Sequence, residues 1–153
     1  MTKEEKKEAR INWRFRWIEL IFEFSHLEYQ NEIWIKNSNP NIIGWYAEDV
    51  NQYFNDLSLE DGYNLVLKEN YVSKEELAVI EEFHLSFDDF VEVENHEQRD
   101  MSDKQRLIDT GWIQIVKLGF EAWNRLKLVI IDQEELKLIA YLESYYLKNK
   151  NIG

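Results

Sequence analysis

The rarity of residues that interrupt helices is the feature that most restricts how this chain can fold. The 153 residues include one proline and five glycines, while 44% are hydrophobic and 14% are aromatic. Turn-rich β proteins need more Gly and Pro, and disordered chains lack the apolar residues for a core. The composition therefore predicts a single domain, residues 1–153, built from packed helices.

Apolar residues recur at helical spacing along most of the chain. In residues 11–24, Ile11, Phe15, Ile18 and Phe22 form one stripe, as expected of a helix with one buried side. Helix-start signals, a serine or aspartate followed three residues later by a glutamate, precede later segments. We expect an all-α bundle of about six helices. The segments with helical patterns are 11–24, 27–36, 45–57, 74–93, 103–109, 111–127 and a last stretch that begins near 132.

Four segments lack this periodicity. Residues 1–10 are charged and carry no apolar stripe, so we expect a mobile N-terminal segment. The polar stretch 37–41 contains the proline and predicts a turn. The acidic stretch 94–103 predicts a mobile loop, and 58–67 gives no clear helical pattern.

The charge and the missing cysteines exclude several classes of protein. The formal net charge is −12 and there is no cysteine. Nucleic acid and anionic membranes should be repelled, and neither disulfides nor cysteine-based metal sites can form. The charged N-terminus is not followed by an apolar signal segment, and no apolar run is long enough to span a bilayer. We therefore expect a cytoplasmic protein without a cofactor; the oligomeric state stays open.

The negative charge is concentrated in residues 75–103, which hold eleven acidic side chains and one arginine. On the helix expected at 74–93, apolar residues cover one side and acidic residues the other. Such a face is either a solvated surface or a docking surface for a basic protein, whose approach it would accelerate. The carboxylates on that face are Glu81, Glu82, Asp88, Asp89 and Glu92.

Large aromatic residues stand in polar surroundings in "HLEYQNEIWIKNSNP", residues 26–40. One helical turn separates Tyr29 from Ile33 and Trp34, so these side chains can face the core while the amides face water. We expect Tyr29 and Trp34 to be mostly buried. The six tryptophans of the chain should pack in the core or at its edge.

Two Glu-x-x-His motifs, Glu23–His26 and Glu81–His84, resemble the motif pairs of di-iron helical bundles. The periodicity places Glu23 on the polar side of its helix and His26 beyond the helix end, so we expect no convergence on a metal. His84, with Asp88 one turn later, is expected at the edge of the apolar face. An enzyme that uses these motifs stays an alternative to a protein with no chemistry of its own.

Short motifs near both ends of the chain occur in the same order in a known family. One lies in "FRWIELIFEFSHLEYQNEIWIKNSNP" and another in "DTGWIQIVKLGFEAW", where a tryptophan opens a helix. The motif residues of the first stretch are Arg16-Trp17, Tyr29-Gln30, Trp34 and Pro40. These stretches resemble a family of small acidic bacterial proteins classed as immunity proteins of polymorphic toxin systems. The resemblance implies that this protein binds and neutralises a cognate toxin.

Three places depart from that family's pattern. His26-Leu27 stands where the family tends to have Asp-Pro. Asn31 and Glu32 stand where the family tends to have arginines, and Asn55, in "YFND", replaces one of two expected acids. If these positions contact the toxin, the toxin bound here differs from those of the family. Our leading hypothesis is a cytoplasmic immunity protein that meets a basic toxin through the five carboxylates above and through Asn31 and Glu32. A helical adaptor or structural protein is the second hypothesis.

Overall fold

The computed structural model describes residues 1–38, 44–97 and 101–147. Within these ranges, every regular element is helical. The all-α fold predicted from the sequence is confirmed. The α-helices are α1 Lys3–Ser25, α2 Leu27–Tyr29, α3 Tyr46–Asn51, α4 Asn64–Lys68, α5 Lys74–Glu97, α6 Asp103–Arg106, α7 Thr110–Val129 and α8 Gln133–Leu147. Two π-helical segments, η1 Gln30–Ile35 and η2 Gln52–Asp56, continue α2 and α3 directly.

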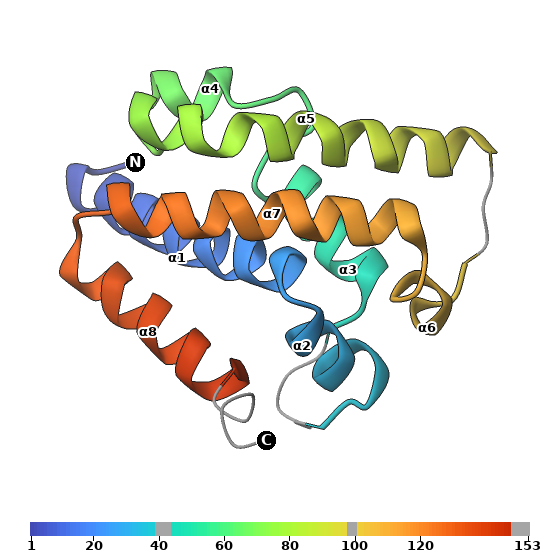
Figure 1. Ribbon diagram of the computed structural model, residues 1–153. Helices are drawn as coiled ribbons and strands as arrows, with labels where there is room; N and C mark the ends of the chain where they lie inside the picture. The colour runs from blue at the N-terminus through green and yellow to red at the C-terminus, as the bar shows by residue number, and fades with distance from the viewer. Residues whose placement is uncertain (39–43, 98–100, 148–153) are drawn as a thin grey trace.

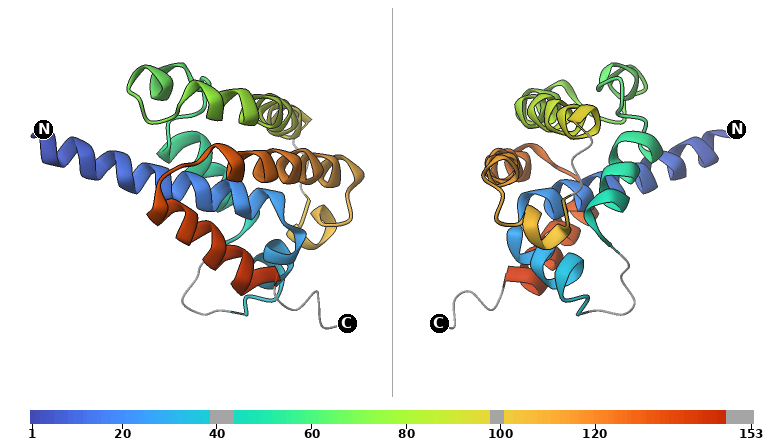
Figure 2. Two further views of the ribbon diagram at one scale, coloured as in Figure 1. Left: turned by 60° about the vertical axis from the view of Figure 1, so that its left-hand side comes forward. Right: turned by 90° about the vertical axis from the view of Figure 1, so that its right-hand side faces the viewer.

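The four long helices form the body of the fold, and the short ones close its edges. Helix α7 lies between α5 and α1, and α8 packs against α1 (Figure 1). Figure 2 shows the same order from two other sides, with α5 outermost. One broad side of α5 is therefore left without a covering helix, and this side carries the acidic residues of interest.

Helix α1 begins well before the first apolar stripe, which corrects the expected mobile segment at residues 1–10. The Thr2 hydroxyl accepts a hydrogen bond from the Glu5 backbone N–H at 3.1 Å, which caps the helix. Glu4 in the first turn also suits the positive end of the helix dipole. Farther along, the Arg10 guanidinium donates to the Asn70 carbonyl oxygen at 2.8 Å. The apolar stripe predicts where α1 is buried, whereas its start depends on a cap.

Three other boundaries differ from the sequence prediction. Helix α5 continues to Glu97, so residues 94–97 are helical and not part of a loop, because Glu94 is buried and paired. Residues 98–100 and 39–43 lie outside the described residues, and with them most of the expected turn at 37–41. Helix α4 was not predicted; it is a single turn whose Val66 faces the core.

The core is built around aromatic side chains. Trp17, Trp112 and Trp123 are fully buried, and Phe24 and Phe87 meet at a ring-centroid distance of 4.6 Å between α1 and α5. Aromatic residues bury large areas at low entropic cost, so they supply much of the stabilisation in a chain of this size. The expected packing of the tryptophans is confirmed except at the entry to α3, where Trp45 is exposed.

The aromatic residues of the stretch 26–40 are buried as predicted, with Tyr29 3% and Trp34 7% exposed. The Trp34 indole N–H donates to Asp49 at 3.3 Å, and so connects η1 to α3. Next to them Gln30 is fully buried: its amide N–H₂ donates to the carbonyls of Glu23 and Phe24 at the end of α1. The amide of Gln30, which was expected to face water, therefore satisfies backbone groups that the core would otherwise leave unpaired.

A chain of hydrogen bonds crosses the core between α1 and α5. The Trp17 indole donates to the Tyr63 hydroxyl at 2.8 Å, and the Tyr63 and Tyr53 hydroxyls lie 2.7 Å apart. The Tyr53 hydroxyl lies 2.8 Å from Nδ1 of His84. Every member is satisfied when each hydroxyl donates to the next residue and a neutral His84 accepts at Nδ1. His84 is thus buried, not at the edge of the core, and burial lowers its pKa to about 4.

Replacing Tyr53 with phenylalanine tests this chain of hydrogen bonds. The variant leaves the Tyr63 O–H without an acceptor and His84 Nδ1 without a donor, both in the core, so we expect the free energy of unfolding to fall by about 1–3 kcal/mol. Urea denaturation measures the change. Tyr141→Phe, at a residue that is 60% exposed, is the matched control and should stay within about 0.5 kcal/mol of the parent. Equal stability of both variants would contradict the proposed connectivity.

Candidate partner-binding surface

Helix α5 is fixed at its start by the capping box predicted from the sequence. The Ser73 hydroxyl accepts from the Glu76 backbone N–H at 3.1 Å, and the Glu76 carboxylate accepts from the Ser73 N–H at 2.8 Å. From this start, Phe83 and Phe87 turn inward and are buried. The opposite side of the same helix must then face solvent.

That outer side carries the five predicted carboxylates of α5, which we call the acidic face. Four of them are exposed and Asp88 is half-buried: the set is Glu81, Glu82, Asp88, Asp89 and Glu92. Within the described parts of the chain, none of the five forms an ion pair with a basic side chain. Partial burial, with the neighbouring charge of Asp89, raises the pKa of Asp88. Ion pairs within the described residues therefore do not neutralise the negative charge of the acidic face.

Two apolar side chains interrupt the acidic face. Leu85 is 59% exposed and Val93 is 40% exposed, and their spacing places them on the same side as Asp89. Single exposed apolar residues are ordinary on protein surfaces. An apolar centre with a charged rim, however, is the arrangement typical of protein interfaces. Helix α5 therefore offers both the charge and the contact area that a partner would need.

A groove runs along the acidic face, between α5 and the segment formed by α3 and η2. Its volume is about 400 Å³. The lining residues are Tyr46, Ala47, Val50, Asn51, Phe54, Asn55, Glu60, Asp88, Val91, Glu92, Glu94 and Asn95. Asp88 and Glu92 belong to both the groove and the acidic face. The sequence did not indicate Glu60, Asn51 or Asn95, because only the packing of η2 against α5 brings them there.

Two acids from the acidic segment do not contribute to its surface. Glu76 is buried and paired with Arg14, and Glu94 is buried and paired with Arg106. Glu94 also accepts from the Tyr46 hydroxyl at 2.6 Å, and the Arg106 guanidinium carbon lies 3.4 Å from the centre of the Tyr46 ring. The charge count of the segment therefore overstates the charge that a partner would meet.

Asn31 and Glu32 do not join the acidic face. Both lie on η1, at the opposite end of the molecule from α5 in Figures 1 and 2. Asn31 is exposed, and Glu32 pairs with Lys36 at 3.2 Å; its hydrogen bonds to Lys36 and Ser38 lower the pKa of Glu32. The two halves of the predicted contact set therefore form separate surfaces, and only the α5 half is continuous.

The residues of the two Glu-x-x-His motifs do not converge; the predicted position of Glu23 was wrong, whereas His26 lies just beyond the end of α1 as expected. Glu23 is not on a solvated side of α1 but buried, since it pairs with Arg16 at 2.8 Å. His26 is also buried, and its Nδ1 lies 2.9 Å from the Phe22 carbonyl oxygen. Glu81 is exposed while His84 faces the core. Across the described residues, no three His, Asp or Glu side chains are grouped so that they could hold a metal ion.

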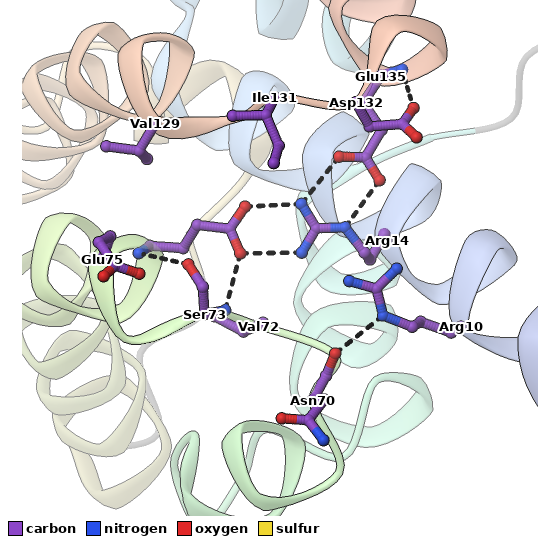
Figure 3. Close-up of a pocket in the computed structure, with 11 residues that line it drawn as sticks. Arg10, Arg14, Asn70, Val72, Ser73, Glu75, Val129, Ile131, Asp132 and Glu135 are labelled. Atoms are coloured by element: carbon purple, nitrogen blue, oxygen red, sulfur yellow. Dashed lines mark hydrogen bonds and ion pairs between the residues drawn. The ribbon is translucent and has the colours of Figure 1, made fainter.

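A second cavity, of about 590 Å³, lies between the start of α5 and the turn before α8 (Figure 3). Its floor is Arg14, whose guanidinium donates to Glu135 at 2.7 and 2.8 Å and to Glu76 at 2.6 and 2.9 Å. A further bond to the Tyr71 carbonyl oxygen uses the remaining N–H. Because each N–H of this arginine is satisfied within the chain, the floor has no donor left for a ligand.

Another buried polar cluster lies between α1 and α3. Arg16 lies 2.8 Å from Glu23 and 3.8 Å from Asp49, and Asp49 is 1% exposed. One guanidinium faces two buried carboxyl groups, and burial, with the charge of Glu23, raises the pKa of Asp49 to about 10. Paired carboxyl groups with separated pKa values occur in acid–base enzymes. Here the pair is enclosed by protein, and its hydrogen bonds are to Arg16 and Trp34.

The residues that carry the family resemblance are mostly internal. The Arg16 side chain bonds to Glu23 and the Trp17 indole to Tyr63. The Trp112 indole donates to Gln30 at 2.9 Å, which ties α7 to η1. We found no match to this chain among protein-family models, curated proteins or solved structures. None of the helices that the structure describes is long and apolar enough to cross a bilayer.

Proposed function

We propose that this protein is an immunity protein, which binds a basic bacterial toxin in the cytoplasm and blocks it without chemistry of its own. The observation that carries this proposal is the acidic face of α5, a run of carboxylates that have no cationic partner among the described residues. Like charges one helical turn apart cost a few tenths of a kcal/mol each. A function that needs the negative charge of the acidic face would explain why the chain tolerates this repulsion.

The proposed mechanism is electrostatic capture followed by occlusion. A toxin whose active surface holds phosphates would carry basic residues there, and the acidic face would present carboxylates to the same residues. Long-range attraction raises the association rate, and the effect weakens as salt screens it. Leu85 and Val93, exposed within the face, would then be covered in the complex and slow dissociation. The resemblance of the motifs around Trp17 and Trp112 to immunity proteins agrees with this mechanism.

The function is tested by capture and rescue. The tagged protein is used to isolate binding proteins from its own bacterium, and each candidate gene is expressed in a test strain with and without this chain. Growth inhibition that co-expression relieves supports the proposal. A helical adaptor would instead capture proteins that do not inhibit growth. This outcome would contradict the immunity function and support the adaptor hypothesis.

Charge reversal on the acidic face should slow association with the captured toxin. Glu82→Lys with Asp89→Lys removes attraction from two exposed positions opposite the buried Phe83 and Phe87, so the fold should persist. We expect the association rate at low salt to fall by about tenfold or more, with a smaller difference at high salt. Stopped-flow fluorescence measures the rate.

The control for this experiment has the same change in net charge at another place. Glu121→Lys with Glu134→Lys alters exposed residues of α7 and α8, and its association rate should stay within about twofold of the parent rate. Equal slowing in both double variants would mean that net charge alone matters and that the acidic face is not the docking surface.

A further inference from the structure

We infer that the groove between α5 and α3–η2 receives an arginine side chain of the partner; this inference rests on the proposed function. In this groove, carboxylates of the acidic face stand beside a concave apolar wall. Its two sides come from segments far apart in the sequence, Tyr46–Asp56 and the second half of α5. A flat charged face would accept many cations, whereas a groove selects by shape.

The floor of the groove is suited to the aliphatic part of a long basic side chain. Val50, Phe54 and Val91 line it, with Phe54 buried and the two valines half-buried. Arginine and lysine place methylene groups along apolar surfaces while their charged ends reach polar groups. A purely acidic groove would lack this contact, and a purely apolar one would not hold the charge.

The rim of the groove supplies acceptors from both walls. Asp88 and Glu92 come from the α5 wall, and Glu60 comes from the segment after η2. The side-chain N–H₂ of Asn55 donates to Asn51, so the amide oxygen of Asn55 is available as a further acceptor. A guanidinium has five N–H donors in a plane and matches acceptors on two sides, whereas an ammonium is a point charge. The arrangement therefore favours arginine over lysine.

The inner wall already binds an arginine of this chain by the same chemistry. Arg106 pairs with Glu94 and lies over the ring of Tyr46, and both of these residues line the groove. Its charge is compensated there, while Asp88 and Glu92, six and two residues before Glu94 on α5, have no cationic partner among the described residues. The outer half of the groove is thus the half that a second arginine would complete.

A metal ion does not fit the same place. In the part of the chain that the structure describes, no three His, Asp or Glu groups are close enough together to coordinate one. The carboxylates of the groove are spread along its rim, which suits an extended organic cation.

The position of Asn55 also connects the groove to the family resemblance, since Asn55 stands where the family tends to have an acid. A partner arginine beside an amide would distinguish this complex from those of the family.

The test uses short peptides as probes, followed by backbone amide NMR shifts at low salt. Acetyl-Gly-Arg-Gly-amide should shift the amide signals of Asn55, Asp88 and Asn95, and should bind several-fold more tightly than the lysine peptide. The citrulline peptide, which has the same shape without the charge, should give no shifts. Asp88→Asn with Glu92→Gln should weaken arginine binding by about tenfold, the scale of two charge-assisted hydrogen bonds. Glu81→Gln with Glu82→Gln is the matched control, outside the groove, and should change binding by less than about twofold.

The outcomes separate this inference from the proposed function. If both double variants weaken the arginine peptide equally, or if the citrulline peptide binds as well, the groove is not an arginine site. The captured toxin would in that case still respond to reversal of Glu82 and Asp89, so the immunity function would stand. If no captured protein is toxic, the immunity function fails, whereas selective peptide binding in the groove would still assign it to a basic segment of another partner. Ala47→Leu, which narrows the groove and leaves every carboxylate in place, should also weaken the arginine peptide; unchanged binding would contradict insertion.

Discussion

Replacing Arg14 with methionine should lower the free energy of unfolding by about 3–5 kcal/mol, the usual effect of removing one member of a buried ion cluster. Arg14 joins α1 to Glu76 of α5 and Glu135 of α8, which are 62 and 121 residues away in the sequence. Burial alone would lower the pKa of Arg14, but its bonds to these carboxylates raise it, so the guanidinium stays charged. Without it, two carboxylates would be buried beside each other. Guanidinium chloride denaturation measures the loss.

A triple variant separates two effects on the free energy of unfolding: the destabilisation from unpaired buried charges, and the stabilisation that the intact ion cluster provides. Arg14→Met with Glu76→Gln and Glu135→Leu removes all three charges and keeps an acceptor at residue 76 for the capping box of α5. Well-packed apolar replacements of buried ion clusters are often neutral or stabilising, so this variant should recover most of the lost stability. If the triple variant is as unstable as Arg14→Met alone, the loss comes from packing around residue 14 and not from unpaired charge.

The sequence predicts the helices because helical periodicity is a local property. Residues 74–93 and 111–127 were identified from apolar spacing, and α5 and α7 contain both ranges. The burial of Tyr29 and Trp34 followed from the same reasoning. Helix starts and ends were less predictable, because a single cap such as Thr2 or a single buried pair such as Glu94–Arg106 decides them.

The polar residues of the interior could not be assigned from the sequence. Glu23 was placed on a solvated side of α1, since charged residues are rarely buried without a partner. Its partner Arg16 is only seven residues away, but Asp49, the group that shares its cluster, is on α3. Spacing along one helix cannot reveal which charged residues meet an opposite charge on another helix. The acidic face was predictable because all of its residues lie on one helix. The groove was not, because its walls come from segments that are far apart in the sequence.

The burial of charged residues also changes how the acidic segment is understood. Of its members, Glu76 and Glu94 hold α5 to the rest of the fold through arginines, whereas the carboxylates of the acidic face form no such pair with another described residue. Substitutions at the first two should therefore affect folding, and substitutions at the others should affect binding. This division makes the binding proposal testable without loss of the fold.

Replacing Asp49 with asparagine should make the stability of the protein less dependent on pH above neutrality. Burial, with the charge of Glu23, raises the pKa of Asp49 to about 10, while an unfolded aspartate has a pKa near 3.9. The folded protein therefore keeps a proton that the unfolded chain loses, and stability falls as the pH rises between these values. Asparagine reproduces the protonated side chain: its oxygen can accept from Trp34 and its N–H₂ can donate to Glu23.

The pH window for this experiment follows from the histidines. Burial lowers the pKa of His84 to about 4, below the unfolded value near 6.5, so His84 makes stability fall as the pH drops through that range. Below pH ~6.5 it opposes the contribution of Asp49, and above that value Asp49 acts without this opposition. Between pH ~6.5 and ~8.5 we expect the parent protein to lose up to about 1.4 kcal/mol per pH unit.

Urea denaturation across that window measures both slopes. Asp49→Asn should be the more stable protein, with a nearly flat profile, and its advantage should widen as the pH rises. Glu134→Gln changes an exposed carboxylate and should keep the parent slope. A parent profile as flat as that of Asp49→Asn would mean that Asp49 is ionised in the folded protein. In that case Arg16, which lies 2.8 Å from Glu23 and 3.8 Å from Asp49, would compensate two buried carboxylates at once, and the cluster would owe its stability to the guanidinium and not to a shared proton.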